Sequence, residues 1–112
     1  MVSLKYEKLF KKLVQESRVF LVGYPFKRFE KRGIKGERIR DYLTEAAIIP
    51  SRELDLLPIK NKFYCIRREP VGFFTFPVLL FKNCVVVKTG YLSNKREIHK
   101  YKEKERLLRR DE

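Results

Sequence analysis

Apolar residues recur every three or four positions near the N-terminus, with lysines between them. This spacing gathers the apolar side chains on one face of an α-helix. We therefore predict an amphipathic helix over residues 3–16, with Ser3 as its N-cap. The residues that define its apolar face are Tyr6, Leu9, Phe10, Leu13 and Val14.

The pattern changes after this helix. Residues 18–24, with the sequence RVFLVGY, are rich in β-branched and aromatic residues and predict a strand. Gly33 and Gly36 predict a turn, and apolar residues at helical spacing then predict a second helix over residues 36–47. Pro50 ends this region, because a proline disfavours helical backbone in the residue before it.

The middle of the chain predicts a small antiparallel sheet. Its three expected strands are residues 62–67, 73–81 and 84–92. Lys82 and Asn83 form a two-residue connection between the last two strands, which is typical of a β-hairpin. The segment before the sheet, SRELDLLP, predicts one short helical turn closed by Pro58.

Pro77 interrupts the second of these strands. A proline has no backbone N–H to donate to a neighbouring strand, so within a sheet it belongs at an edge or a bulge. The second strand therefore covers either the whole of residues 73–81 or residues 78–81 alone.

A basic helix is predicted near the C-terminus. Asn94 and Glu97 have the spacing of a capping box, in which each side chain bonds the backbone N–H of the other residue. Ile98 and Tyr101 begin a narrow apolar stripe on this helix. Together the elements predict one α+β domain over residues 1–112, with a small antiparallel sheet packed against N-terminal helices. The C-terminal helix is expected beside or across the last strand.

The charge of the chain is strongly one-sided. The formal net charge is +13, and the sequence pI is about 10.0. The predicted sheet region, residues 59–93, holds six Lys or Arg residues and one carboxylate, Glu69. A cationic sheet surface suits a polyanion, and RNA or DNA is the usual one. The alternatives are an acidic protein partner and a structural or assembly protein whose charge serves solubility.

Several classes of function lack their sequence signatures. No apolar run approaches the roughly 18–20 residues of a membrane span. Charges replace the apolar block of a signal peptide near the N-terminus, so we expect a cytoplasmic protein with no membrane partner. Cys65 and Cys84 lie in apolar runs and are expected to be buried free thiols. Because His99 is the single histidine and Glu69 stands alone in the sheet region, we expect no zinc or magnesium site and no cofactor.

Cleavage of RNA without a metal ion is compatible with this composition. Attack by the ribose 2′-OH needs a base, cations that stabilise the phosphorane, and an acid for the leaving oxygen. Arg and Lys can supply the cations, and His or Tyr can transfer the protons. The candidates on the sheet and the start of the last helix are Arg67, Arg68, Lys88, Tyr91, Lys95, Arg96, His99 and Tyr101.

These candidates also have structural interpretations. Arg67 and Arg68 are adjacent in a strand, so they point to opposite faces of the sheet. Tyr101 lies on the apolar stripe of its helix and is expected to pack in the core. Lys88 stands at a strand end, where a lysine commonly aids solubility, and a lone histidine such as His99 is commonly structural or exposed.

The order of these segments resembles the RelE/HigB-type toxins, which are ribosome-dependent mRNA endonucleases of bacterial and archaeal toxin–antitoxin pairs. The likeness covers residues 54–108, about half of the chain. Its blocks are FYCIR at residues 63–67, VLLF at 78–81, CVVVKTGY at 84–91 and KREI at 95–98. Each block is short and mostly apolar, so the order and spacing of the blocks carry the resemblance.

The resemblance implies a RelE-like fold and a metal-independent mRNA endonuclease that acts at the ribosome and is bound by a cognate antitoxin. The chain departs from the family pattern at Pro77, which stands where the family has an arginine, and in its N-terminal order of helix, strand, helix. Binding of RNA or DNA without cleavage is therefore the alternative. The expected catalytic residues are Arg67, Lys88, Arg96 and His99. The residues expected to bind nucleic acid are Lys62, Arg68, Tyr91, Lys95 and Lys100.

Overall fold

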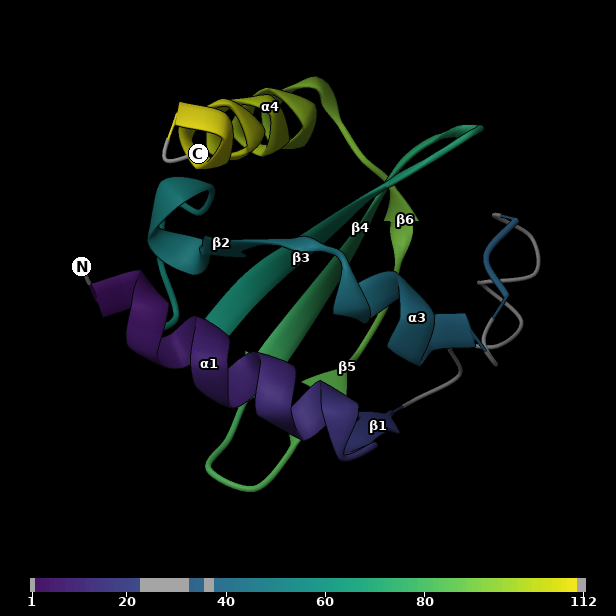
Figure 1. Ribbon diagram of the computed structural model, residues 1–112, viewed down its shortest axis with the longest axis vertical. Helices are drawn as coiled ribbons and strands as arrows, with labels where there is room; N and C mark the ends of the chain where they lie inside the picture. Colours follow the sequence, from purple (N-terminus) through teal and green to yellow (C-terminus); the bar gives the residue numbers. More distant parts are fainter. Residues whose placement is uncertain (1, 23–32, 36–37, 111–112) are drawn as a thin grey trace.

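The computed structural model describes residues 2–22, 33–35 and 38–110 (Figure 1). No helix within these three ranges is long and apolar enough to cross a membrane. The elements in chain order are helix α1 (Val2–Gln15), strand β1 (Val19–Leu21), helix α3 (Ile39–Thr44), strand β2 (Ala47–Pro50), the 3₁₀ turn η2 (Ser51–Glu53), strands β3 (Lys62–Glu69), β4 (Gly72–Leu80), β5 (Val85–Val87) and β6 (Tyr91–Leu92), and helix α4 (Lys95–Arg110).

The predicted amphipathic helix is present as α1, and the chain turns sharply after it. Ser17 takes a left-handed backbone conformation with φ of 61°. This conformation lets the N–H of Arg18 reach the carbonyl of Leu13 at 2.8 Å, which closes the last helical turn. The chain then enters β1. Residues 23–24 of the predicted strand and residues 36–37 of the predicted second helix lie outside the described residues.

The strands form one mixed sheet in the order β1-β5-β4-β3-β2, and β6 also pairs with β4. Consecutive strands from β2 to β5 are antiparallel, whereas β1 runs parallel to β5. The α+β prediction is confirmed. The sheet is mixed, not wholly antiparallel as predicted, because the edge strand β1 pairs in parallel with β5.

The second predicted helix ends earlier than expected. The extension of this helix to residue 47 is wrong, because α3 ends at Thr44 and the next residues form β2. Ile48 and Ile49 join different clusters of buried residues, as neighbouring residues of a strand do. Pairing with β3, where Ile48 lies opposite Cys65, favours the strand over the weak helical pattern.

Strand β4 runs through Pro77, so it covers the longer of the two predicted ranges. The sheet register explains how the proline is tolerated. Strand β6 pairs with β4 at residues 74–75, strand β5 pairs with it at residues 78–80, and Pro77 falls between the two. The strand predicted over residues 84–92 is accordingly divided into β5 and β6. A residue without an N–H is accommodated where the neighbouring strand is interrupted.

The two faces of the sheet are covered by different helices (Figure 1). On one face, α1 and α3 pack over a large apolar cluster that includes Phe63 and Cys65 of β3. On the other face, Tyr64 and Ile66 of the same strand pack with Tyr101 of α4. Alternate residues of β3 therefore face different helices, and both sets are buried.

Helix α4 packs against β2 and β3, not beside or across the last strand as predicted. The rings of Tyr101 and Phe73 meet edge to face, with centroids 5.2 Å apart. Further along α4, Lys104 reaches the edge strand β2 and also pairs with Glu7 of α1. Tyr101, which is expected in the core, is partly buried and packs against the edge of the buried cluster on this face of the sheet.

Candidate nucleic-acid interface

The start of α4 is fixed by the predicted capping box. The N–H of Glu97 donates to Asn94 Oδ1 at 2.8 Å, and the N–H of Asn94 donates to Glu97 Oε1 at 2.9 Å. The hydroxyl of Tyr91 donates to the second oxygen of Glu97 at 2.6 Å. Glu97 is buried, so this carboxylate links β6 to the helix and sets where the basic residues of the first turns emerge.

The predicted residues of α4 are placed on its outer surface. Lys95, Arg96 and His99 are exposed. The Arg96 guanidinium donates a long hydrogen bond of 3.4 Å to the carbonyl of Glu53 in η2. His99 Nε2 lies 3.2 Å from Glu103 of the next turn, and Lys100 lies between Glu53 and Glu103 at 3.7 and 3.5 Å. Lys100 is thus engaged by two carboxylates, whereas exposed Lys95 at the helix start has no described carboxylate within ion-pair distance.

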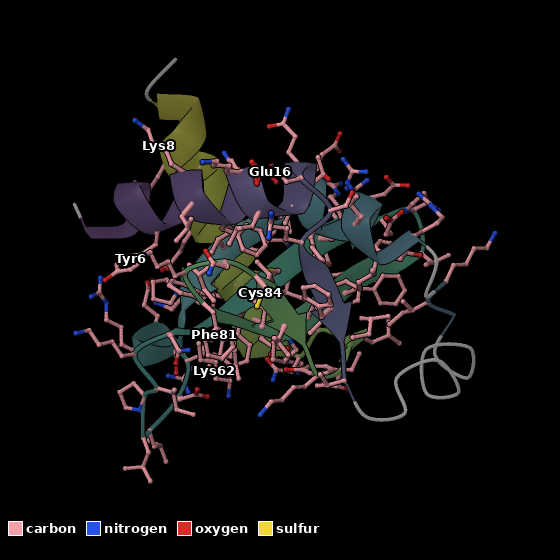
Figure 2. All side chains as sticks on the ribbon, turned by 90° about the horizontal axis from the view of Figure 1, so that it is seen from below. Tyr6, Lys8, Glu16, Lys62, Phe81 and Cys84 are labelled. Atoms are coloured by element: carbon pink, nitrogen blue, oxygen red, sulfur yellow. The ribbon has the colours of Figure 1, made fainter. Side chains whose placement is uncertain are left out.

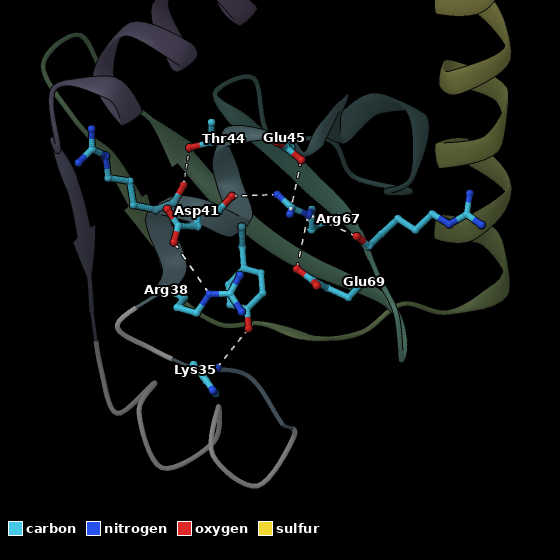
Figure 3. Close-up of polar contacts among 10 residues, drawn as sticks. Lys35, Arg38, Asp41, Thr44, Glu45, Arg67 and Glu69 are labelled. Carbon is cyan, nitrogen blue, oxygen red and sulfur yellow. Dashed lines mark hydrogen bonds and ion pairs between the residues drawn. The ribbon is translucent and has the colours of Figure 1, made fainter.

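Arg67 is engaged by groups of the protein itself (Figure 3). Its guanidinium donates to the carbonyl of Asp41 at 2.9 Å and lies 3.5 Å from the carboxylates of Glu45 and Glu69. Its side chain is 18% exposed. One oxygen of Glu69 is buried and accepts no hydrogen bond from the described residues, so the nearby Arg67 charge is its compensation. Arg67 therefore ties β3 to α3 and is not available to a phosphate.

Arg68 and Lys88 differ from Arg67 because both are exposed. Arg68 points to the α4 face, as the alternation of a strand requires, and lines a hollow of about 380 Å³ with Phe73 and Tyr101. Lys88 lies in the segment between β5 and β6. The sheet separates Arg67 from the α4 residues, so the structure does not bring the four predicted catalytic residues together.

A polar network that the sequence did not predict surrounds Asp55. This carboxylate accepts hydrogen bonds from Ser51 Oγ at 2.6 Å, from Lys62 Nζ at 3.2 Å and from the Tyr64 hydroxyl. Burial raises the pKa of Asp55, but the bonds from Ser51, Tyr64 and Lys62 outweigh burial and leave the pKa below its ordinary value. Lys62, predicted to bind nucleic acid, is thus partly neutralised. In the sequence, only the four-residue spacing of Ser51 and Asp55 indicates that these two side chains could meet.

The same network fixes an apolar loop. Ser51 Oγ donates to Asp55 and accepts the N–H of Ile59 at 3.1 Å, so one buried hydroxyl holds both ends of the segment. Between these ends, Leu56 is 95% and Leu57 is 87% exposed. The loop thus presents two leucines to solvent from a fixed base.

The tyrosines near the predicted site are held as hydrogen-bond donors. Burial, followed by the bond to Glu97, strongly raises the pKa of Tyr91. Burial and the bond to Asp55 also raise the pKa of Tyr64. A phenol that stays protonated and donates to a carboxylate does not accept a proton at neutral pH. Neither tyrosine is therefore set up as the base of an RNA cleavage reaction.

The surface charges of the described residues are unevenly paired. All carboxylates with described side chains have a partner, in an ion pair or, for Glu97 and Glu105, in a hydrogen bond from tyrosine. Many exposed cations, in contrast, have no described carboxylate within ion-pair distance. They include Lys8, Lys11, Lys12, Lys35, Arg52, Lys60, Lys82, Lys88 and Lys95.

Metal ligands do not gather in the part of the chain that the structure describes, where no group of three His, Cys, Asp or Glu side chains could hold an ion. Cys65 is fully buried and burial strongly raises the pKa of its thiol, so the thiol is an inert core group. Cys84 is a free thiol at the β4–β5 hairpin.

Searches of protein families, curated proteins and solved structures find no match to this chain.

Proposed function

We propose that this protein is a nucleic-acid-binding module that holds RNA or DNA through its phosphates without cleaving it. One observation carries the proposal: the described carboxylates are engaged within the protein, whereas many exposed Lys and Arg side chains on α1, α4 and the strand connections have no described carboxylate partner. The excess positive charge is therefore directed at solvent. A cytoplasmic location, where nucleic acid is accessible, is part of this proposal.

The physical basis is the release of counterions. Each phosphate that a Lys or Arg neutralises frees condensed cations from the nucleic acid, and this gain shrinks as the salt concentration rises. Lysines without carboxylate partners suit this role, because no internal ion pair has to be broken before they meet a phosphate. Lys60, Lys82, Lys88 and Lys95 are of this kind.

Binding is favoured over cleavage by the placement of the predicted catalytic residues. Arg67 is bound to Asp41, Glu45 and Glu69 on the α3 face, and His99 is paired with Glu103 on the outside of α4. Cleavage needs a base, an acid and cations around one phosphate. No such group is assembled among the described residues.

The test is a salt titration of affinity. We expect the protein to bind a labelled RNA strand and a DNA duplex, with a logarithmic dependence on salt of about 0.9 per phosphate contact for the duplex. Retention on a nitrocellulose filter measures it, and denaturing gels of the same samples check that the RNA stays intact. Absent binding, or affinity that does not change with salt, would remove the proposal.

A RelE/HigB-like mRNA endonuclease is the second candidate. It is supported by the order β3, β4, β5, β6 and α4, in which the basic helix begins at Lys95 as that resemblance expects. On this candidate, expression arrests growth, a cognate antitoxin relieves the arrest, and mRNA on the ribosome acquires new 5′ ends. Primer extension with and without ribosomes, for the wild type and Lys88→Ala, tests it. Intact transcripts in every sample would exclude it.

A further inference from the structure

Two adjacent hollows lie at the end of the sheet nearest the N-terminal half of α1. One of about 320 Å³ lies beside η2 and the β2–β3 connection, and one of about 390 Å³ lies beside the β4–β5 hairpin. Both are lined by Tyr6, Lys60 and Phe63, so the two hollows adjoin one another. Their sizes fall within the range of natural small-ligand sites. We call this feature the Tyr6 groove.

Aromatic rings run along the groove. Tyr6 packs on Phe63 with ring centroids 5.8 Å apart and a tilt of 45°. Phe63 is almost fully buried and fixes the ring of Tyr6 from below, while Tyr6 is partly exposed. At the hairpin end Phe81 is 45% exposed (Figure 2). The groove therefore offers ring surfaces that the core holds in place without fully covering them.

Cations stand at both ends and in the middle of the same groove. Arg52 lines one end, Lys82 the other, and Lys60 lies between them. All three are exposed, and none has a described carboxylate within ion-pair distance. No carboxylate is among the lining residues. Glu7, on the same helix as Tyr6, is paired with Lys104.

Two other hollows among the described residues lack this combination. The one below α4 that contains Arg68 also contains Glu105, so a phosphate there meets a carboxylate. The hollow between α1 and α3 has Lys11 and Arg40 but no aromatic ring. Arg40 is moreover occupied by the carbonyls of Val14 and Gln15.

We propose that the Tyr6 groove binds unpaired nucleotides of a single strand, with bases against Tyr6 and Phe81 and phosphates at Arg52, Lys60 and Lys82. Stacking on aromatic side chains with phosphates on flanking cations is how single strands are held without sequence preference. A duplex keeps its bases stacked inside, so it uses the cations but not the rings. This inference rests on the proposed function and names its substrate class.

The experiment compares a labelled single-stranded oligouridylate with an RNA hairpin duplex by fluorescence anisotropy at fixed salt. Phe81→Ala removes a ring without changing charge, and we expect single-strand affinity to fall by roughly tenfold while duplex affinity stays unchanged. Leu107→Ala is the matched control, because Leu107 is 60% exposed on α4, away from the groove. We expect it to change neither affinity.

A charge-reversal pair gives a second readout. Lys60→Glu with Lys82→Glu should weaken single-strand binding more than Lys12→Glu with Lys35→Glu, which makes the same net change outside the groove. Circular dichroism establishes that each variant is folded. If both pairs lost the same single-strand affinity and Phe81→Ala bound as the wild type does, the groove would not be the binding site. The proposed function would still stand. Failure of the wild type to bind either RNA would overturn both.

Discussion

Lys104 of α4 donates a hydrogen bond of 2.7 Å to the backbone carbonyl of Ile48, on the outer edge of β2. Strand β2 has β3 on one side only, so its outer carbonyls lack a strand partner. The same ammonium pairs with Glu7 of α1. One lysine therefore joins the last helix, the edge strand and the first helix.

Replacement of this lysine should weaken the fold. In Lys104→Met the alkyl chain still covers the edge, but the carbonyl and Glu7 lose their donor. We expect the free energy of unfolding to fall by about 1–2 kcal/mol, as for a partly buried charge-assisted hydrogen bond. Urea denaturation measures the change. Lys102→Met, on the exposed side of α4, is the control, and an equal effect of both variants would contradict the role of Lys104.

The capping box makes a separate prediction at the other end of α4. Asn94→Ala removes the acceptor for the Glu97 N–H, and loss of such an N-cap costs about 1 kcal/mol. Thermal unfolding followed by circular dichroism should show a lower midpoint. Lys95→Ala, one residue further along, leaves the cap intact. If Lys95→Ala lowered the midpoint as much, the cap would not be the cause.

Asp55 predicts a pH dependence of stability. Its pKa is lower in the folded chain than the ordinary 3.8, so its contribution is fully present above that value. The contribution is lost as the pH falls through the lower, folded pKa. We expect wild-type stability to drop over this acidic range and Asp55→Asn to show a shallower drop. Urea unfolding at a series of pH values tests this, and parallel curves would argue against it.

Substitutions at Arg67 and Lys88 should have different effects: one should lower stability and the other should weaken nucleic-acid binding. Arg67→Ala leaves Glu69 buried without its compensating charge, so we expect a loss of about 2 kcal/mol in unfolding free energy and an unchanged salt dependence of nucleic-acid binding. Lys88→Ala should leave stability unchanged and reduce the salt slope by about one phosphate contact. Urea denaturation gives the unfolding free energy of each variant, and filter binding gives the salt dependence of its affinity. A reversed pattern would restore Arg67 as a phosphate ligand.

Short sequence motifs correctly predicted two local features of the fold, the cap of α4 and the β4–β5 hairpin. The capping box of Asn94 and Glu97 is present as predicted, because both partners lie within one turn. The hairpin at Lys82 and Asn83 is also confirmed, since the N–H of Phe81 bonds the carbonyl of Cys84 at 2.9 Å. Each of these features depends on only a few neighbouring residues.

Features that depend on contacts between residues far apart in the sequence could not be predicted from local sequence patterns. Strand β2 exists because Ile48 meets β3, and the continuity of β4 through Pro77 depends on where β5 gives way to β6. The engagement of Arg67 follows from the position of α3, which no short motif near Arg67 reveals. The Tyr6 groove likewise joins side chains of α1 and two strand connections.

The exposed leucines of the loop held by Ser51 should affect how molecules of the protein associate in solution. Leu56 and Leu57 are almost as exposed in the folded chain as in an unfolded one, so their apolar surface contributes little to holding the fold. Contact between two such loops would bury that surface, and the repulsion between chains of net charge +13 opposes the contact. A bound polyanion neutralises this repulsion. Solutions of the protein should therefore be clear alone and turn turbid when nucleic acid approaches charge equivalence, and Leu56→Ser with Leu57→Ser should keep them clear.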